Sequence, residues 1–224
     1  MGQTSILSQL QKRFLDLVIA EPTLIRDYYW TGGTVLSEFY LHHRDSEDID
    51  LFTETAEVQI ASVNTFMSRC AKQLEVKNVK YTQFLGLHTF IFEFSDNLPL
   101  KIDFNYYPFT LLEAGKMYRG LKYDSVLDIA VNKMQTIATK PRSRDFIDLY
   151  LIQKTYGYNL VDLMKQARLK FDWYTDPIQL AAKFLLAKEV SDLPKMRVNL
   201  PENEWRDFFL DQAKAMQELS FDKK

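Results

Sequence analysis

Residues 30–36, Trp-Thr-Gly-Gly-Thr-Val-Leu, and residues 44–52, Arg-Asp-Ser-Glu-Asp-Ile-Asp-Leu-Phe, hold the pattern around which this chain is organised. Two glycines open a turn, an apolar helix over 35–41 follows, and a short strand then carries Asp48 and Asp50. Successive side chains of a strand point to opposite faces, so the two aspartates share one face. Ile49 and Leu51 point to the other face, where they can enter a core. The pattern therefore predicts two neighbouring carboxylates on a half-buried strand.

This combination suits a phosphate and a metal ion. Two carboxylates held side by side repel each other unless a cation lies between them. Mg²⁺ is such a cation, because it binds one or two carboxylates and completes its shell with waters and substrate phosphates. A Gly-Gly turn before a helix offers a phosphate close backbone approach, free N–H groups and the positive end of the helix dipole. Either motif alone is common in solvated turns, but the two in this order indicate a triphosphate site beside a metal site.

These residues also carry a family resemblance. A Gly-Gly turn followed by Asp-x-Asp on a strand resembles the signature of the DNA polymerase β-like nucleotidyltransferase superfamily. More narrowly, Gly-Gly-Thr-x-Leu followed by Arg44-x-Ser46-x-Asp48-Ile-Asp50-Leu-Phe is similar to the AbiEii/AbiGii group of bacterial toxin-type nucleotidyltransferases. The resemblance covers most of residues 30–152 and implies transfer of a nucleoside monophosphate from an NTP to an acceptor. The residues expected to bind the nucleotide are Gly32, Gly33, Thr34, Arg44, Ser46 and Lys133.

A third carboxylate is expected from the run 100–106. Its apolar residues alternate with Lys101, Asp103 and Asn105, so Asp103 is predicted on the polar face of a strand beside the one that carries Asp48 and Asp50. Three carboxylates from two neighbouring strands form the metal site that nucleotidyl transfer uses. The resemblance implies the same, with two Mg²⁺ ions (or Mn²⁺) and with Asp103 helping to deprotonate the acceptor. The alternative is an ordinary exposed aspartate.

The chain turns helical after Tyr123, and Lys133 lies in the first of these helices. Helical spacing predicts that Lys133, Thr136 and Lys140 share a side away from the buried face. The resemblance makes Lys133 the lysine of a helical Lys-x-x-Ala/Thr motif that contacts the nucleotide phosphates. The alternative is a solvated surface lysine.

The next helix is predicted to begin after Pro141, with Ser143 as its N-cap. Asp145 and Asp148 lie three residues apart on one face, and the Arg-Asp-x-x-Asp-Leu pattern looks like the last motif of the family. Asp145 is therefore a candidate catalytic residue, and the role of Asp148 stays open. Structural alternatives are a favourable charge at the helix N-terminus for Asp145 and an Arg144–Asp148 pair.

Three other residue types have competing interpretations. Arg44 suits a phosphate because its guanidinium is a rigid fork of donors, but a salt bridge to Glu47 or Asp48 is an equal alternative. His42 and His43 lack a second ligand cluster nearby, which disfavours zinc and leaves their role open. The single cysteine, Cys70, is expected to be a small buried hydrophobic residue.

The composition is that of a single folded protein of ordinary type. Its 224 residues are 46% hydrophobic and 26% charged. We expect an α/β (α+β) fold, with a small mixed β-sheet and flanking helices over 1–120 and a helical C-terminal lobe over 121–224. The active site is expected in the cleft between them. The absence of an apolar run long enough to span a membrane, together with the one cysteine, predicts a cytoplasmic protein.

The acceptor is the open question. A net charge of −2 and a pI near 6.0 give no global attraction to nucleic acid, so an RNA acceptor needs a local basic patch. The resemblance implies a toxin paired with an antitoxin, with the 3′ end of tRNA as acceptor. Two alternatives are a small-molecule nucleotidyltransferase of the aminoglycoside type and a nucleotide-binding module that has lost turnover. The residues proposed for the basic patch are Arg119, Lys122, Lys140, Arg142 and Arg144.

Overall fold

The computed structural model describes residues 5–96, 98–172 and 176–221. It divides into two compact units, Met1–Ser125 and Val126–Lys224. The mixed α/β fold class expected from the sequence is confirmed.

The first unit is built on a seven-stranded mixed sheet in the order β3-β4-β5-β2-β1-β7-β6. In the middle of the sheet, β2 pairs in parallel with β5 and antiparallel with β1. The strands are β1 (Tyr29–Thr31), β2 (Asp48–Thr53), β3 (Asn78–Phe84), β4 (Leu87–Glu93), β5 (Leu100–Tyr106), β6 (Lys116–Tyr118) and β7 (Leu121–Tyr123). Because β1, β2 and β5 are neighbours, the glycine turn and both acidic strands are brought together.

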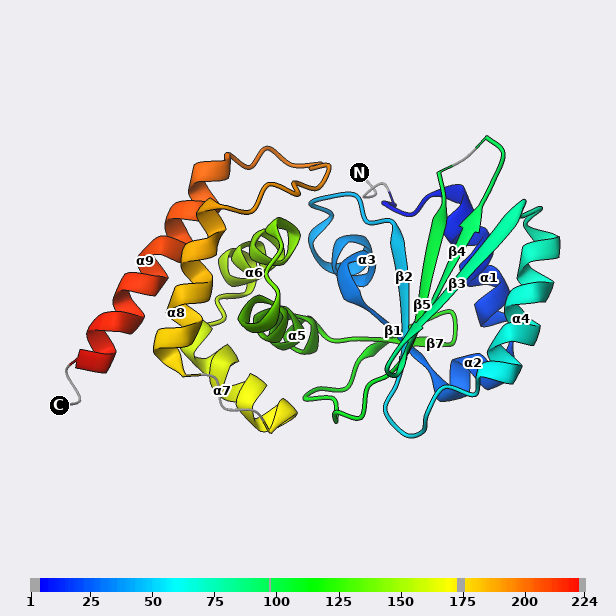
Figure 1. The fold of residues 1–224 in the computed structure, drawn as a ribbon, viewed down its shortest axis with the longest axis horizontal. Helices are drawn as coiled ribbons and strands as arrows, with labels where there is room; N and C mark the ends of the chain where they lie inside the picture. Colours follow the sequence, from blue (N-terminus) through cyan, green and yellow to red (C-terminus); the bar gives the residue numbers. More distant parts are fainter. Residues whose placement is uncertain (1–4, 97, 173–175, 222–224) are drawn as a thin grey trace. The chain divides into compact units, whose positions relative to one another are not determined.

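Helices cover both faces of this sheet. Figure 1 shows α1 (Gln9–Ile19), α2 (Pro22–Asp27) and α4 (Ile60–Gln73) on one side and the short α3 (Gly32–Leu36) on the other. Phe14 of α1 packs edge-on against both Phe66 of α4 and Phe92 of β4, and it is fully buried. The strand β2 alternates between half-buried and buried residues, as the sequence predicts, with Ile49 and Leu51 in the core. Asp48 and Asp50 lie on the half-buried face of β2, where a ligand can reach them.

The helix after the glycine turn differs from the expected 35–41. It already begins at Gly32, and from Ser37 to Leu41 it continues as a π-helix that ends at His42 in a left-handed conformation (φ 50°). The glycines thus form the first turn of the helix itself. Their backbone N–H groups are among those that a helix start leaves without an intrahelical partner.

The hairpin of β6 and β7 was not expected from the sequence. Each strand has only three residues, too few for an alternating pattern to be recognised. Arg119 and Gly120 form its turn with φ values of 51° and 95°. Positive φ at both central residues is typical of a tight hairpin turn. The result is a hairpin whose β7 is mostly buried beside β1, while β6 forms the edge of the sheet opposite β3 and exposes Lys116 and Met117.

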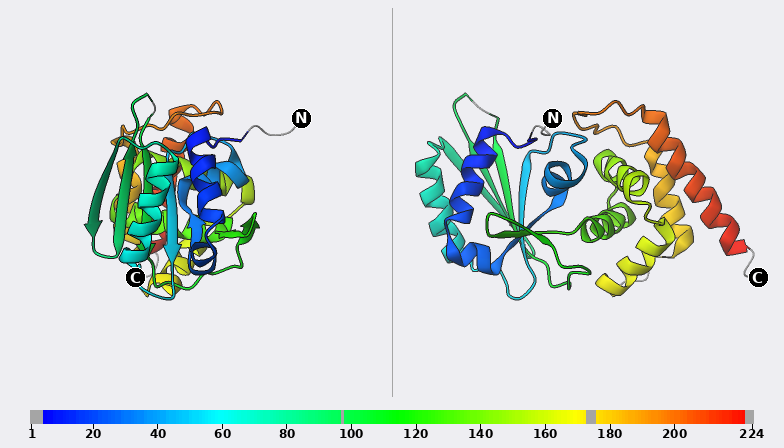
Figure 2. Two further views of the ribbon diagram at one scale, coloured as in Figure 1. Left: turned by 90° about the vertical axis from the view of Figure 1, so that its right-hand side faces the viewer. Right: turned by 180° about the vertical axis from the view of Figure 1, so that it is seen from behind.

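The second unit is helical. It contains α5 (Val126–Thr139), α6 (Ser143–Tyr156), α7 (Leu160–Phe171), α8 (Pro177–Leu185), a 3₁₀ turn (Leu186–Lys188) and α9 (Glu202–Phe221). Figure 2 shows α8 and α9 side by side, and α5 packs against α6, α7 and α8. Phe209 of α9 lies 4.8 Å from Phe146 of α6 and 5.1 Å from Phe184 of α8, measured between ring centroids. These rings form the core of the unit.

Two sequence expectations for this unit are corrected. Ser143 is the first residue of α6 and not its N-cap, because Arg142 occupies the cap position. The carboxylate of Asp192 caps the helix from elsewhere in the chain by accepting a hydrogen bond from the Ser143 backbone N–H at 2.9 Å. The apolar stripe of residues 180, 184 and 185 predicts a core position for Leu185, but this residue is 42% exposed because α8 ends there and the chain tightens into the 3₁₀ turn.

Within the residues that the structure describes, no helix combines the length and apolar character needed to cross a membrane.

Candidate active site

Asp50 lies directly against the glycine turn. The two meet because β1 and β2 pair with Thr31 opposite Asp50. A Cβ atom at Gly32 would come within 2.1 Å of Asp50 Oδ2, and the Gly32 backbone has a φ of 83°. Only glycine satisfies both conditions, since the left-handed region and the close approach each disfavour a side chain. The backbone at Gly32 and the Asp50 carboxylate therefore share one surface.

A second set of contacts fixes the other side of the turn. Thr34 Oγ1 lies 2.8 Å from Ser46 Oγ and 2.5 Å from the backbone oxygen of Asp48. A Cβ atom at Gly33 would lie 2.3 Å from Nη2 of Arg44, whose side chain is buried and donates from Nη1 to the backbone oxygen of Asp45 at 3.0 Å. All five nucleotide-binding residues predicted in this unit are thus gathered around the start of α3.

Asp103 lies beside the Asp-x-Asp strand, as the sequence predicts. The parallel pairing of β2 and β5 puts Asp103 in register with Asp50. Both of its carboxylate oxygens are already bound: Thr89 Oγ1 donates to Oδ1 at 2.6 Å, and Lys101 Nζ donates to Oδ2 at 2.6 Å. Only 5% of Asp103 is exposed, so it is a buried, fully hydrogen-bonded carboxylate and not the ordinary exposed aspartate of the alternative interpretation.

Lys101 is the residue of this site that sequence reasoning missed. Its ammonium also lies 3.4 Å from Asp48 Oδ2, so it bridges two of the three predicted carboxylates. Burial alone would lower the pKa of Lys101, but the hydrogen bond that it donates to Asp103 and the charges of Asp48, Asp103 and Asp50 hold this pKa above its usual value. The signal was present, because residues 101 and 103 share a strand face by alternation.

The donor set fits Mg²⁺ in kind. Carboxylate oxygens are its preferred protein ligands, and Asp48 and Asp50 present them on one strand face. Within residues 5–96, 98–172 and 176–221, no three His, Cys, Asp or Glu side chains are gathered closely enough to hold a metal ion. Mg²⁺ usually takes one or two carboxylates and fills its shell from water and substrate phosphates. A site with fewer than three protein carboxylates is therefore sufficient for it.

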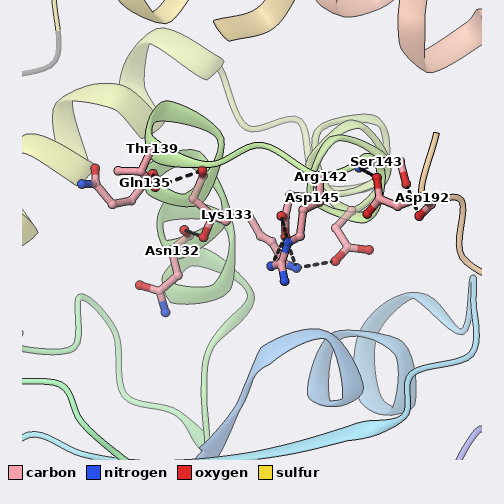
Figure 3. A network of polar contacts seen from close by, with 10 residues as sticks. Asn132, Lys133, Gln135, Thr139, Arg142, Ser143, Asp145 and Asp192 are labelled. Atoms are coloured by element: carbon pink, nitrogen blue, oxygen red, sulfur yellow. Dashed lines mark hydrogen bonds and ion pairs between the residues drawn. The ribbon is translucent and has the colours of Figure 1, made fainter. Parts of the chain in front are cut away.

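The second unit carries its own polar network, shown in Figure 3. Lys133 Nζ lies 2.7 Å from Asp145 Oδ1 and 2.8 Å from Asp148 Oδ2, and Arg142 Nε lies 2.8 Å from Asp145 Oδ2. Both aspartate side chains are fully buried. Burial alone would raise the pKa of Asp145, but the charges of Lys133 and Arg142 outweigh it and hold the pKa below its usual range.

This network corrects the placement of Lys133. The sequence put it off the buried face of its helix, yet only 8% of the residue is exposed. The reason is that α6 packs on α5 and supplies two carboxylates that compensate the buried charge. The solvated-lysine interpretation is therefore wrong. Contact of Lys133 or Asp145 with a nucleotide stays a prediction.

The two histidines and the single cysteine lie in surroundings that explain them structurally. His43 is buried, with Nδ1 3.5 Å from Ser37 Oγ, and His42 ends the π-helix. Cys70 is buried in α4, and burial raises the pKa of its thiol to about 12. A thiol with that pKa stays protonated at neutral pH and is a poor nucleophile, as expected from the sequence.

The close approach at Gly32 gives a testable prediction. Gly32→Ala introduces both backbone strain and a clash with Asp50, so we expect a loss of about 2–4 kcal/mol in the free energy of unfolding. Gly157→Ala is the matched control, because Gly157 also has a positive φ (72°) but nothing within 4 Å of its Cβ position. It should lose only about 1–2 kcal/mol. If urea denaturation showed the same loss of unfolding free energy for both variants, the predicted clash between residue 32 and Asp50 would be wrong.

Known proteins of solved structure share this fold. JHP933 from Helicobacter pylori is 18% identical with a TM-score of 0.58, over 97% of this chain and 96% of that one. A second H. pylori structure, described as a candidate nucleotidyltransferase, is 17% identical with a TM-score of 0.59, over 97% and 99% of the two chains. An uncharacterized protein of Aquifex aeolicus (strain VF5), aq_aa25, is 28% identical over 167 residues, 74% of this chain and 76% of that protein.

The glycine turn, the paired acidic strands and the mixed sheet define the class as a nucleotidyltransferase. The chain also belongs to one particular family within this class. Residues 13–224 match the family described as nucleotidyl transferase AbiEii toxin of type IV toxin–antitoxin systems, and the chain belongs to that family. The resemblance noted on residues 30–52 is thereby confirmed and extends through the helical unit.

Proposed function

We propose that this enzyme transfers a nucleoside monophosphate from an NTP to the 3′ end of a tRNA, and that it acts as the toxin partner of an antitoxin. An acceptor oxygen forms a bond to the α-phosphorus as its proton leaves. The bond from that phosphorus to the oxygen bridging to the β-phosphate breaks, and pyrophosphate departs. The observation that carries this proposal is the register of Asp50 with Asp103, with Gly32 against the Asp50 carboxylate.

The proposed roles follow from the contacts in the first unit. Asp48 and Asp50 would hold Mg²⁺ (or Mn²⁺), which when bound neutralises the triphosphate and polarises it toward attack. Backbone N–H groups at the start of α3 and the side chains of Arg44 and Ser46 are the proposed phosphate donors. Asp103, held in place by Thr89 and Lys101, is the proposed group that accepts the proton of the acceptor. Such chemistry depends on position and charge more than on a protein nucleophile.

The β6–β7 hairpin supports an RNA acceptor. Residues 116–123, Lys-Met-Tyr-Arg-Gly-Leu-Lys-Tyr, contain three cations and no acid, and Lys116 and Arg119 are exposed. Arg119 is paired with Asp16, but both side chains are more than half exposed, and such pairs are weak. Exposed cations of this kind contact the phosphates of a nucleic-acid backbone. Of the other basic residues predicted to contact RNA, Arg142 is bound to Asp145.

A double charge reversal tests this hairpin. Lys116→Glu with Lys122→Glu should weaken tRNA binding about tenfold or more at low salt and flatten its salt dependence, because fewer counterions are released. Lys165→Glu with Lys214→Glu, two exposed lysines of the second unit, is the matched control and should change little. NTP binding should be unchanged in both. Unaltered tRNA affinity and salt slope, measured by fluorescence anisotropy, would remove the hairpin from the acceptor site.

The overall proposal is tested by incubating the protein with each labelled NTP and Mg²⁺, with either total tRNA or an aminoglycoside panel as acceptor. Label on tRNA that is removed by 3′ trimming is the expected result. Label on an aminoglycoside would instead identify a small-molecule enzyme. Intact NTP binding without any transfer would identify a module without turnover. Growth arrest on expression, relieved by an antitoxin, tests the toxin role separately.

A further inference from the structure

The acidic face of the first unit contains a fixed positive charge. Lys101 Nζ contacts Asp103 Oδ2 at 2.6 Å and Asp48 Oδ2 at 3.4 Å. The Lys101 side chain is 37% exposed, the Asp48 side chain 23% and the Asp103 side chain 8%. The ammonium therefore lies between two strands, in the space that separates two of the predicted metal ligands.

The contacts of Asp103 place a cation beside the oxygen that a metal ion would otherwise bind. A carboxylate has two oxygens, and here one accepts from Thr89 and the other from Lys101, each at 2.6 Å. Hydrogen bonds of that length to an ionised group are among the strong ones in proteins. A divalent ion on Asp103 Oδ2 would lie beside the Lys101 ammonium and be repelled by it, whereas the Asp50 carboxylate lies against the backbone of Gly32.

The charge balance points the same way. Asp48, Asp50 and Asp103 bring three negative charges and Lys101 brings one positive charge, so the group carries a net charge of about −2 with all four ionised. One divalent ion neutralises that charge completely. A second would have to enter a site that is already neutral and beside a fixed ammonium, with repulsion at short range.

We propose that Lys101 is a positioning residue that takes the place of one metal ion, so that the protein binds a single divalent cation, on the Asp48–Asp50 side. This inference rests on the nucleotidyl-transfer site proposed above and revises the two ions expected from the sequence. Lys101 then holds the Asp103 carboxylate in place through a hydrogen bond, without a metal on it. Any further divalent ion in the reaction then has to arrive with the triphosphate.

The test is to titrate the full chain with Mn²⁺ in the absence of nucleotide and to measure binding by calorimetry and electron paramagnetic resonance. The wild-type protein should bind one Mn²⁺. Lys101→Met should bind a second, or bind the first at least about tenfold more tightly, because a cation beside the carboxylates has been removed. Lys101→Arg keeps the charge and should behave as the wild type. Lys80→Met, in the exposed β3 and paired with Glu93, is the matched control.

Two wild-type Mn²⁺ ions, or identical binding by the wild type and Lys101→Met, would overturn the inference. If Lys101→Met does not fold, as judged by circular dichroism, Lys101→Gln carries the same expectation with a polar side chain. Labelled-NTP transfer on the same preparations separates the two proposals. Transfer by a protein that binds two Mn²⁺ ions as wild type, or whose Mn²⁺ binding Lys101→Met leaves identical, refutes only the role of Lys101. One wild-type Mn²⁺ with the expected change in Lys101→Met, but without transfer to any acceptor, refutes only the proposed function.

Discussion

Replacing Asp50 by asparagine is expected to reduce nucleotidyl transfer by about 10³-fold or more, since it removes a charge that acts on the reacting phosphates through the bound metal. The protein should stay folded. Asp50 is half-buried next to other carboxylates, so its neutralisation relieves repulsion without exposing a core. The measurement is release of labelled pyrophosphate at saturating NTP and Mg²⁺.

The matched control for this variant is Asp96→Asn. Asp96 is exposed in the connection between β4 and β5, so its neutralisation changes the net charge equally and should leave transfer within a factor of two, roughly. Thermal unfolding monitored by circular dichroism establishes that both variants are folded. Near-normal turnover by a folded Asp50→Asn protein would exclude the first unit's acidic face as the catalytic centre.

Replacing Lys133 by methionine is expected to cost about 3–5 kcal/mol of unfolding free energy, because it leaves two buried aspartates without their shared cation. The Lys133 side chain is 10% exposed, and its ammonium lies within 2.8 Å of an oxygen of each aspartate. Arg142 compensates Asp145 only in part, and it reaches that carboxylate from a half-exposed position. Urea denaturation of the full chain measures the loss.

Lys140→Met is the control for charge loss on the same segment. Lys140 is exposed directly after α5, so its removal should change the unfolding free energy by less than about 0.5 kcal/mol. Adding Asp148→Asn to Lys133→Met should recover part of the loss, because one of the two buried carboxylates that lost the Lys133 ammonium is then neutral. A loss below about 1 kcal/mol for Lys133→Met would show that the network contributes little to stability.

The sequence was informative where local geometry decides the outcome. Alternation along β2 and β5 is a property of any strand, so the faces of Asp48, Asp50 and Asp103 could be predicted. The burial of Lys133 could not, because it depends on carboxylates that another helix brings to it. Lys101 is intermediate between these cases. Alternation predicts the strand face on which it lies, but its ion pair with Asp48 depends on the parallel pairing of β2 and β5.

The parallel pairing of β2 with β5 has a consequence for how the enzyme matures. Asp50 and Asp103 are far apart along the chain, and contacts of high sequence separation close late because the intervening loop must first be ordered. A nascent chain emerging from the ribosome therefore exposes the Asp-x-Asp segment well before its partner strand exists. Catalytic competence is expected to arise only once synthesis has passed residue 106, so a product that stops before β5 should have no nucleotidyltransferase activity.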